Sequence, residues 1–159
     1  MKLEEKTIYT VVYMDYQDHV AEADVYSSHE KAVKAVEKIL NDYETTQGNQ
    51  CYVHHTEDDR WDLETIDGGA EITIQKDKVK LNKNDTIVYV LSTARFDDRS
   101  IKAGIYTSLD NAEKVGEEVK SDLKADYNDL NAKDFGNIAD LYDDGSLKGW
   151  VAVKQQPIM

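Results

Sequence analysis

Three residues near the middle of the chain have side chains that could bind a metal or act in catalysis, namely Cys51, His54 and His55. A thiolate and imidazoles are ligands that zinc accepts. No second Cys/His pair stands at zinc-finger spacing, so the cluster supplies at most three ligands. If residues 51–55 form a strand, Cys51 and His55 share one face and His54 lies opposite. We expect a buried cysteine beside exposed histidines, with no metal and no cofactor.

The sequence lacks the Walker, Rossmann and Gly-x-Ser-x-Gly motifs, the glycine-rich and serine-centred patterns of common enzyme classes. A Cys–His nucleophile pair would also need partners that approach from different elements. We therefore predict a protein that is not an enzyme. An enzyme or zinc protein centred on Cys51, His54 and His55 is the alternative.

An acidic run is the second candidate site. Its carboxylates, set against the single base Arg60, are Glu57, Asp58, Asp59, Asp62, Glu64 and Asp67. Strand alternation places Asp62 and Glu64 on one face, opposite Trp61 and Leu63. Carboxylates spaced in this way could imitate phosphates to a basic groove, with Trp61 as an aromatic anchor. The alternative is a solvated turn with Trp61 folded into the core.

Tyrosines form the third candidate site. Tyr26 and Tyr106 end two similar segments, and we expect both to point away from the helix that follows, opposite Val25 and Ile105. Tyr13 is expected on the same face as Tyr26. An exposed sheet face that carries tyrosines is a suitable protein-binding surface. The alternative is that this face packs against the other copy of the repeat or against a second subunit of a homodimer.

Two copies of one pattern position these candidates. Residues 7–13 and 86–92 are apolar on both faces, which predicts strands that are central in a sheet or whose second face is covered. Each is followed by a polar loop and by an alternating strand, at 21–25 and 101–105. The pattern then continues with a helix in each copy.

The helices begin after serines that can cap them, Ser28 and Ser108. Apolar residues at helical spacing predict helices over 29–43 and 109–125. Both copies end in an Asp-Gly hairpin signal, at 67–68 and 144–145, followed by a further apolar strand. Residues Lys76 to Asp85, rich in Lys, Asn and Asp, are predicted to link the copies.

The predicted fold is therefore α+β, a tandem duplication of a ββαβ(β) module. Each copy is expected to be an antiparallel sheet with one helix, and a pseudo-twofold axis is expected to relate the copies. Residues 1–80 form the first predicted repeat and residues 81–159 the second.

The segments "IVYVLS" (87–92) and "GIYTS" (104–108), followed by a capped helix, carry a resemblance. The arrangement resembles short uncharacterised proteins of phages and low-GC Gram-positive bacteria. The resemblance implies a compact ββα fold and a mobile-element origin. It carries over no active-site residue.

The chain has a formal net charge of −13. Residues 1–80 hold 18 acids against 9 bases, net −9, and residues 81–159 hold 14 against 10, net −4. Such a chain repels phosphates and anionic lipids, so we expect no direct binding to nucleic acid or membrane. Acidity is commonly only a solubility device.

A single cysteine and a short apolar N-terminal run lead us to expect a cytoplasmic protein. The partner that the charge favours is a basic protein surface, such as that of a host nucleic-acid-binding or defence protein bound by a phage-encoded inhibitor. The alternative is a small-ligand-binding or sequestering protein with a pocket between the repeats.

Overall fold

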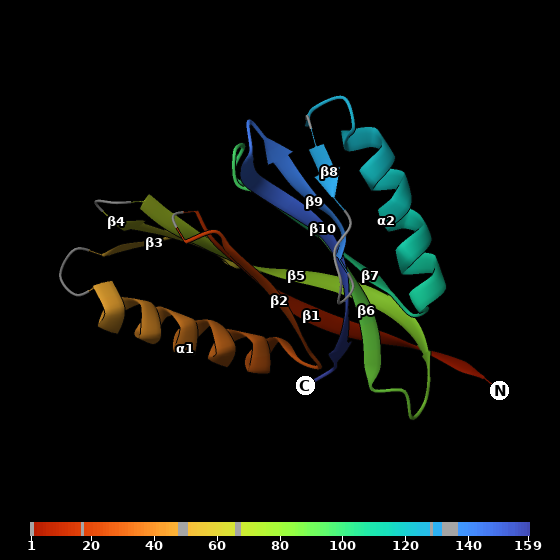
Figure 1. The fold of residues 1–159 in the computed structure, drawn as a ribbon. Coiled ribbons are helices and arrows are strands. Elements are labelled where there is room, and N and C mark those ends of the chain that lie inside the picture. The colour runs from red at the N-terminus through yellow and green to blue at the C-terminus, as the bar shows by residue number, and fades with distance from the viewer. Residues whose placement is uncertain (1, 17, 48–50, 66–67, 128, 132–136) are drawn as a thin grey trace. The chain divides into compact units, whose positions relative to one another are not determined.

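A computed structural model describes residues 2–16, 18–47, 51–65, 68–127, 129–131 and 137–159. The fold is α+β, with two antiparallel five-stranded sheets and two helices (Figure 1). The elements follow one another as β1 (Leu3–Asp15), β2 (Val20–Tyr26), α1 (His29–Gln47), β3 (Tyr52–Glu57), β4 (Arg60–Thr65), β5 (Gly68–Asn82), β6 (Ile87–Arg95), β7 (Ser100–Tyr106), α2 (Leu109–Leu123), β8 (Asp129–Asn131), β9 (Asn137–Asp143) and β10 (Ser146–Pro157).

The chain divides into two compact units. The N-terminal unit comprises Glu5–Lys78 with Ile158–Met159, and the C-terminal unit comprises Met1–Glu4 with Val79–Pro157. The strand orders are β2-β1-β5-β4-β3 and β7-β6-β10-β9-β8, so β1 and β6 each lie between two other strands. Of the two alternatives that their apolar faces predict, the central position is therefore the one found.

Both helices begin where the serines predicted. The backbone N–H of Lys31 donates to Ser28 Oγ, and that of Asn111 donates to Ser108 Oγ, each at 3.2 Å. These bonds satisfy amides of the first helical turn that have no partner within the helix. The first helix extends past the predicted end at residue 43, and the second ends slightly before residue 125. No helix in the described part of the chain is long and apolar enough to span a bilayer.

Each helix covers one face of its own sheet. In the N-terminal unit Ala32 and Val36 of α1 pack with Val11, Leu63 and further sheet residues in one buried cluster. In the C-terminal unit Ala112 and Leu123 of α2 occupy a corresponding cluster with Leu91, Leu141 and Val151.

The Asp-Gly turn between β9 and β10 forms as the sequence predicts. Asp144 and Gly145 have φ angles of 51° and 78°, and Asp143 pairs with Ser146 across the turn. Positive φ at both central residues is the geometry that suits the twist of a two-residue hairpin. Of the other predicted turn, Asp67 lies outside the described residues, while Thr65 and Gly68 are paired on β4 and β5.

The structure corrects the predicted linker. Strand β5 runs through most of the segment from Lys76 to Asp85, with Val79 and Leu81 buried and Lys78 and Lys80 exposed. The sequence contains this alternation, but the lysines and asparagines concealed it. The lysines occupy the exposed positions of a strand whose other positions enter the core.

Each half also has one strand more than the predicted ββαβ(β) pattern, because β3 and β8 add an outer strand beside β4 and β9. The element order is therefore ββαβββ in both halves. The added strand β3 determines the shape of the acidic region described next.

Candidate functional site

The acidic run folds into a β-hairpin made of β3 and β4, which we call the acidic hairpin (residues 52–65). His54 lies opposite Asp62 and Tyr52 opposite Glu64, with an irregularity in the register between His55 and Glu57. Strand β4 also pairs with β5, so the hairpin is anchored on one side by the rest of the sheet.

The two faces of β4 differ as predicted. Trp61 and Leu63 are buried, at 8% and 1% exposure, while Asp62 and Glu64 lie on the other face. The Trp61 ring stacks on His55 with centroids 4.6 Å apart, and it belongs to the core beneath α1. An exposed aromatic anchor is therefore not available at Trp61. Its burial holds the hairpin on the core, so Trp61 is not part of the contact surface.

Carboxylates near the hairpin lie beside basic side chains, because Arg60 pairs with two of them and His29 lies next to a third. Arg60 Nη2 donates to Glu71 Oε2 at 3.1 Å and to Asp62 Oδ1 at 3.4 Å. The charge of Glu71 is the main cause that raises the pKa of Arg60. Asp59 Oδ1 lies 2.7 Å from His29 Nε2. Part of the acidity near the hairpin is thus neutralised by Arg60 within the structure.

The remaining negative charge lies at the tip and outer part of the hairpin. Glu57 and Asp58 are exposed and form no ion pair with any residue in the described ranges. Glu64 is 70% exposed, and its Oε2 atom lies 3.6 Å from His54 Nε2. These three carboxylates are the ones that an approaching cationic surface would meet first.

Cys51, His54 and His55 do not converge. Cys51 and His55 lie on the side of the core, and His54 lies on the opposite face of β3, beside Glu64. Within the part of the chain that the structure describes, no group of three or more His, Cys, Asp or Glu side chains could hold a metal ion. Burial, followed by the charge of Glu44, raises the pKa of the Cys51 thiol, which disfavours the nucleophilic thiolate.

The predicted orientation of the tyrosines is wrong. Tyr13 and Tyr26 pack against the cluster that contains α1, and Tyr106 packs against the cluster that contains α2. All three therefore lie on the helix-covered faces of their sheets. Alternation separates Tyr26 from Val25 correctly, but it cannot tell which face the helix covers when both faces of the neighbouring strand are apolar. Burial and the neighbouring Asp15 raise the pKa of Tyr13.

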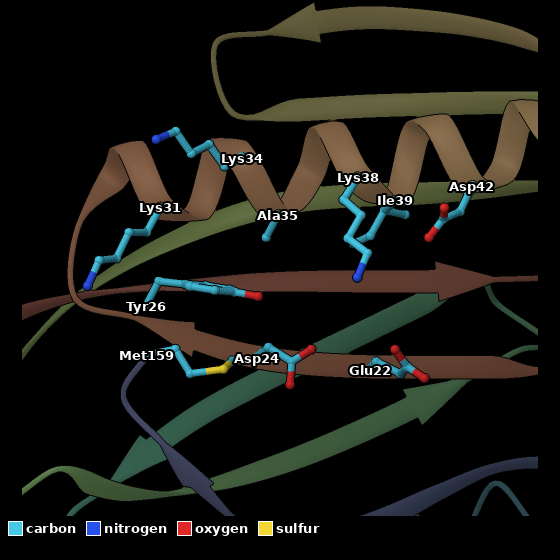
Figure 2. A pocket seen from close by; sticks show the side chains of 10 residues that line it. All are labelled: Glu22, Asp24, Tyr26, Lys31, Lys34, Ala35, Lys38, Ile39, Asp42 and Met159. Atoms are coloured by element: carbon cyan, nitrogen blue, oxygen red, sulfur yellow. The ribbon is translucent and has the colours of Figure 1, made fainter.

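A groove that the sequence analysis missed runs between α1 and β2 (Figure 2). It has a volume of about 570 Å³. In Figure 2 the Lys31 and Lys38 side chains reach from α1 toward β2, and the Tyr26 ring lies between the helix and β2. The lining residues are Glu22, Asp24, Tyr26, Lys31, Lys34, Ala35, Lys38, Ile39, Asp42 and Met159. The signal that could have revealed it is the spacing of three lysines on one side of a predicted helix.

The groove continues into a second cavity of about 310 Å³. Glu22, Ile39 and Asp42 line both, and the second cavity adds Asp15, Asp18 and the rings of Tyr13 and Tyr43. One end of this groove is therefore rich in lysine and the other in carboxylates.

Searches of family models, of curated proteins and of solved structures find no match for this chain. The function must therefore be argued from the geometry of the acidic hairpin and of the groove.

Proposed function

We propose that this chain is a non-enzymatic protein-interaction module whose acidic hairpin binds a basic surface of a partner protein. The observation that carries the proposal is the exposure of Glu57, Asp58 and Glu64 on a hairpin whose other face is fixed in the core by Trp61. A rigid support keeps the carboxylates in place before binding, so less conformational freedom is lost on association.

The class of partner follows from the charge. A protein of net charge −13 is attracted to basic surfaces, and such attraction accelerates association. Basic surfaces of this kind are characteristic of proteins that bind nucleic acids. We propose that the partner is a host nucleic-acid-binding or defence protein, and that the chain acts in the cytoplasm as a phage-encoded inhibitor.

We also propose that the two halves arose by tandem duplication. The shared order of elements and the shared strand order of the two sheets support this origin. In this view the first repeat carries the recognition surface, because its half of the sequence holds the larger acidic excess.

The test uses a triple variant, Glu57→Lys, Asp58→Lys and Glu64→Lys. The partner is first captured from a bacterial lysate and purified, and its association rate with the wild type and the variant is then measured at low and high salt. We expect the variant to associate at least about tenfold more slowly at low salt, because steering by charge is lost. High salt should slow the wild type more than the variant, since exposed charges are screened beyond about 10 Å at 0.1 M.

A matched control makes the same change in net charge elsewhere. Glu113→Lys, Glu117→Lys and Glu118→Lys reverse three exposed acids of α2. If this control slows association as much as the hairpin variant does, the overall charge matters and the hairpin is not the recognition surface. Equal rates for the hairpin variant and the wild type would exclude the proposal.

The groove favours a second candidate function, the binding of a small zwitterionic ligand. Its volume is in the usual range for ligand pockets, about 300–1,000 Å³, and its two ends differ in charge. All the lining residues belong to the N-terminal unit. A thermal-shift screen of amino acids and short peptides on the wild type and on Lys38→Glu tests it. A ligand that stabilises both proteins equally does not bind in the groove.

A further inference from the structure

One hydrogen bond determines which main-chain N–H and C=O groups of β3 point outward, away from the sheet. The backbone N–H of Ile74 donates to the carbonyl of Asp59 at 2.9 Å, just before β4 begins. Main-chain groups of successive residues in a strand point to alternate sides. Trp61 and Leu63 therefore direct their main-chain groups toward β5, and Asp62 and Glu64 direct theirs toward β3.

The same alternation continues into β3. Tyr52 and His54 face Glu64 and Asp62 in the register, so their N–H and C=O groups point inward, to β4. The N–H and C=O groups of Val53 and His55 therefore point away from the sheet. Strand β3 is the last strand of its sheet, and no strand in the described part of the chain pairs with its outer side.

This edge lacks two common protections, lysine and proline, and its register irregularity lies only at the turn end, between His55 and Glu57. Natural proteins block edge strands with lysine, with proline or by making the strand very short. Strand β3 has the sequence YVHHTE, with neither lysine nor proline. Its counterpart β8 is only three residues long. The edge strand β3 of the first sheet is thus long enough to pair with another strand, whereas the edge strand β8 of the second sheet is very short.

We propose that the outer edge of β3 receives an extended basic segment of the partner protein, which joins the sheet as an additional strand. Main-chain bonds to Val53 and His55 would supply the pairing, as in other cases of strand addition. Tyr52 is 66% exposed and lies on the same face as Glu64, so a cationic side chain of the added strand could contact both the ring and the carboxylate. The proposal rests on the proposed function for the basic nature of the partner.

The test uses a synthetic heptapeptide of alternating lysine and valine as the probe, with the full chain labelled with ¹⁵N. We expect amide exchange at Val53 and His55 to slow by about tenfold or more on peptide binding, because these N–H groups become hydrogen-bonded. Exchange at Tyr52 and His54 should change little, since both are already bonded to β4. A peptide with the same charges but with N-methyl groups along one edge is the control, and it should bind at least about tenfold more weakly.

A variant of the protein provides a second test. Val53→Pro removes an outward-pointing N–H, and proline is tolerated at such a position of an edge strand. Val53→Thr, which keeps the N–H, is the matched control. We expect Val53→Pro to weaken peptide binding by about tenfold and Val53→Thr to leave it nearly unchanged.

The outcomes separate this proposal from the proposed function. If both peptides bind equally and the amides of Val53 and His55 stay unprotected, strand addition is wrong, and an effect of the hairpin charge reversals would still support charge-driven binding. If Val53→Pro does not fold, the comparison of the two peptides on the wild type decides alone. Protection at these two amides, lost with the methylated peptide, would establish strand addition whatever the natural partner is.

Discussion

Asp59 Oδ1 lies 2.7 Å from His29 Nε2, which connects the turn of the acidic hairpin to the first residue of α1. The His29 ring also meets the Tyr9 ring edge-on, with centroids 5.6 Å apart. The carbonyl of the same aspartate accepts the bond from Ile74. Asp59 is therefore engaged on two sides, and it contributes to the position of the hairpin more than to its exposed charge.

The free energy that couples His29 and Asp59 should be small. Both side chains are well exposed, at 49% and 39%, and even a fully charged pair on the surface contributes only about 0.2–1 kcal/mol. Urea unfolding of His29→Ala, Asp59→Ala and the double variant measures this coupling. A coupling above about 2 kcal/mol would contradict the prediction. Asp58→Ala, which removes an unpaired carboxylate, is the control and should leave stability within about 0.5 kcal/mol of the wild type.

Gly116→Ala should destabilise the protein, although alanine is the better helix former by about 1 kcal/mol. A Cβ atom at this position of α2 would come within 2.0 Å of Ile138 Cδ1 and 3.2 Å of Leu91 Cδ1. Overpacking of this kind costs about 1–3 kcal/mol. The free energy of unfolding in urea checks the prediction.

A second substitution provides the control for Gly116→Ala. Ile138→Val removes the obstructing Cδ1 atom and should recover part of the lost stability when it is combined with Gly116→Ala. If the two changes are simply additive, the steric explanation is wrong.

Tyr127 should make stability depend on pH in the alkaline range. Its hydroxyl donates to Asp97 Oδ1 at 3.0 Å and accepts from Arg95 Nε at 2.8 Å. Burial raises the pKa of Tyr127 to about 12, with Asp97 adding to this and Arg95 opposing it. The unfolded chain loses the phenolic proton first, near pH 10. The contribution of this raised pKa is therefore fully present below pH 10 and is lost as the pH rises toward 12.

The measurement compares the unfolding free energies of the wild type and Tyr127→Phe between pH 9 and pH 12. The wild type should lose roughly 1–3 kcal/mol of unfolding free energy relative to Tyr127→Phe as the pH rises over this range. Other tyrosines with raised pKa, such as Tyr13 and Tyr16, are present in both proteins, so their effects cancel. A constant difference would mean that Tyr127 titrates at its ordinary pKa.

Cys51 should react slowly with iodoacetamide at pH 8. Burial and the charge of Glu44 raise the pKa of its thiol, and only the thiolate reacts. The urea-unfolded protein should be alkylated faster than the folded one, and Glu44→Gln should accelerate the alkylation of Cys51 in the folded protein.

Elemental analysis of the purified protein tests the expectation that no stoichiometric zinc is bound. One zinc per chain would favour a metal function instead.

Local signals in the sequence were sufficient for the helix starts and for one turn. Ser28 and Ser108 act on amides only three residues away, and Asp144-Gly145 sets its own backbone geometry. Such features depend on neighbours in the sequence, so they can be read without knowledge of the fold. The placement of Trp61 and Asp62 on opposite faces of β4 was predictable for the same reason, because it follows from strand alternation alone.

The features that the sequence did not reveal depend on residues far apart in the chain. Strand alternation predicts that Tyr26 and Val25 lie on opposite faces of the sheet, but the path of α1 decides which of these faces the helix covers. The pairing of Arg60 with Glu71 and the contact of His29 with Asp59 need elements that meet only after folding. The groove between α1 and β2 has the same origin, because its two walls come from different elements.

The open edge of β3 also bears on how the protein behaves in concentrated solution. An exposed edge is a template on which another copy can pair, and such pairing is the first step in the growth of fibres. At neutral pH the net charge of −13 keeps copies apart by repulsion. Near the sequence pI of about 4.6, where the negative and positive charges balance, this repulsion disappears. The negative net charge at neutral pH thus allows the chain to keep the edge of β3 exposed without aggregating. The protein should be stored and assayed well above the pH at which that charge is lost.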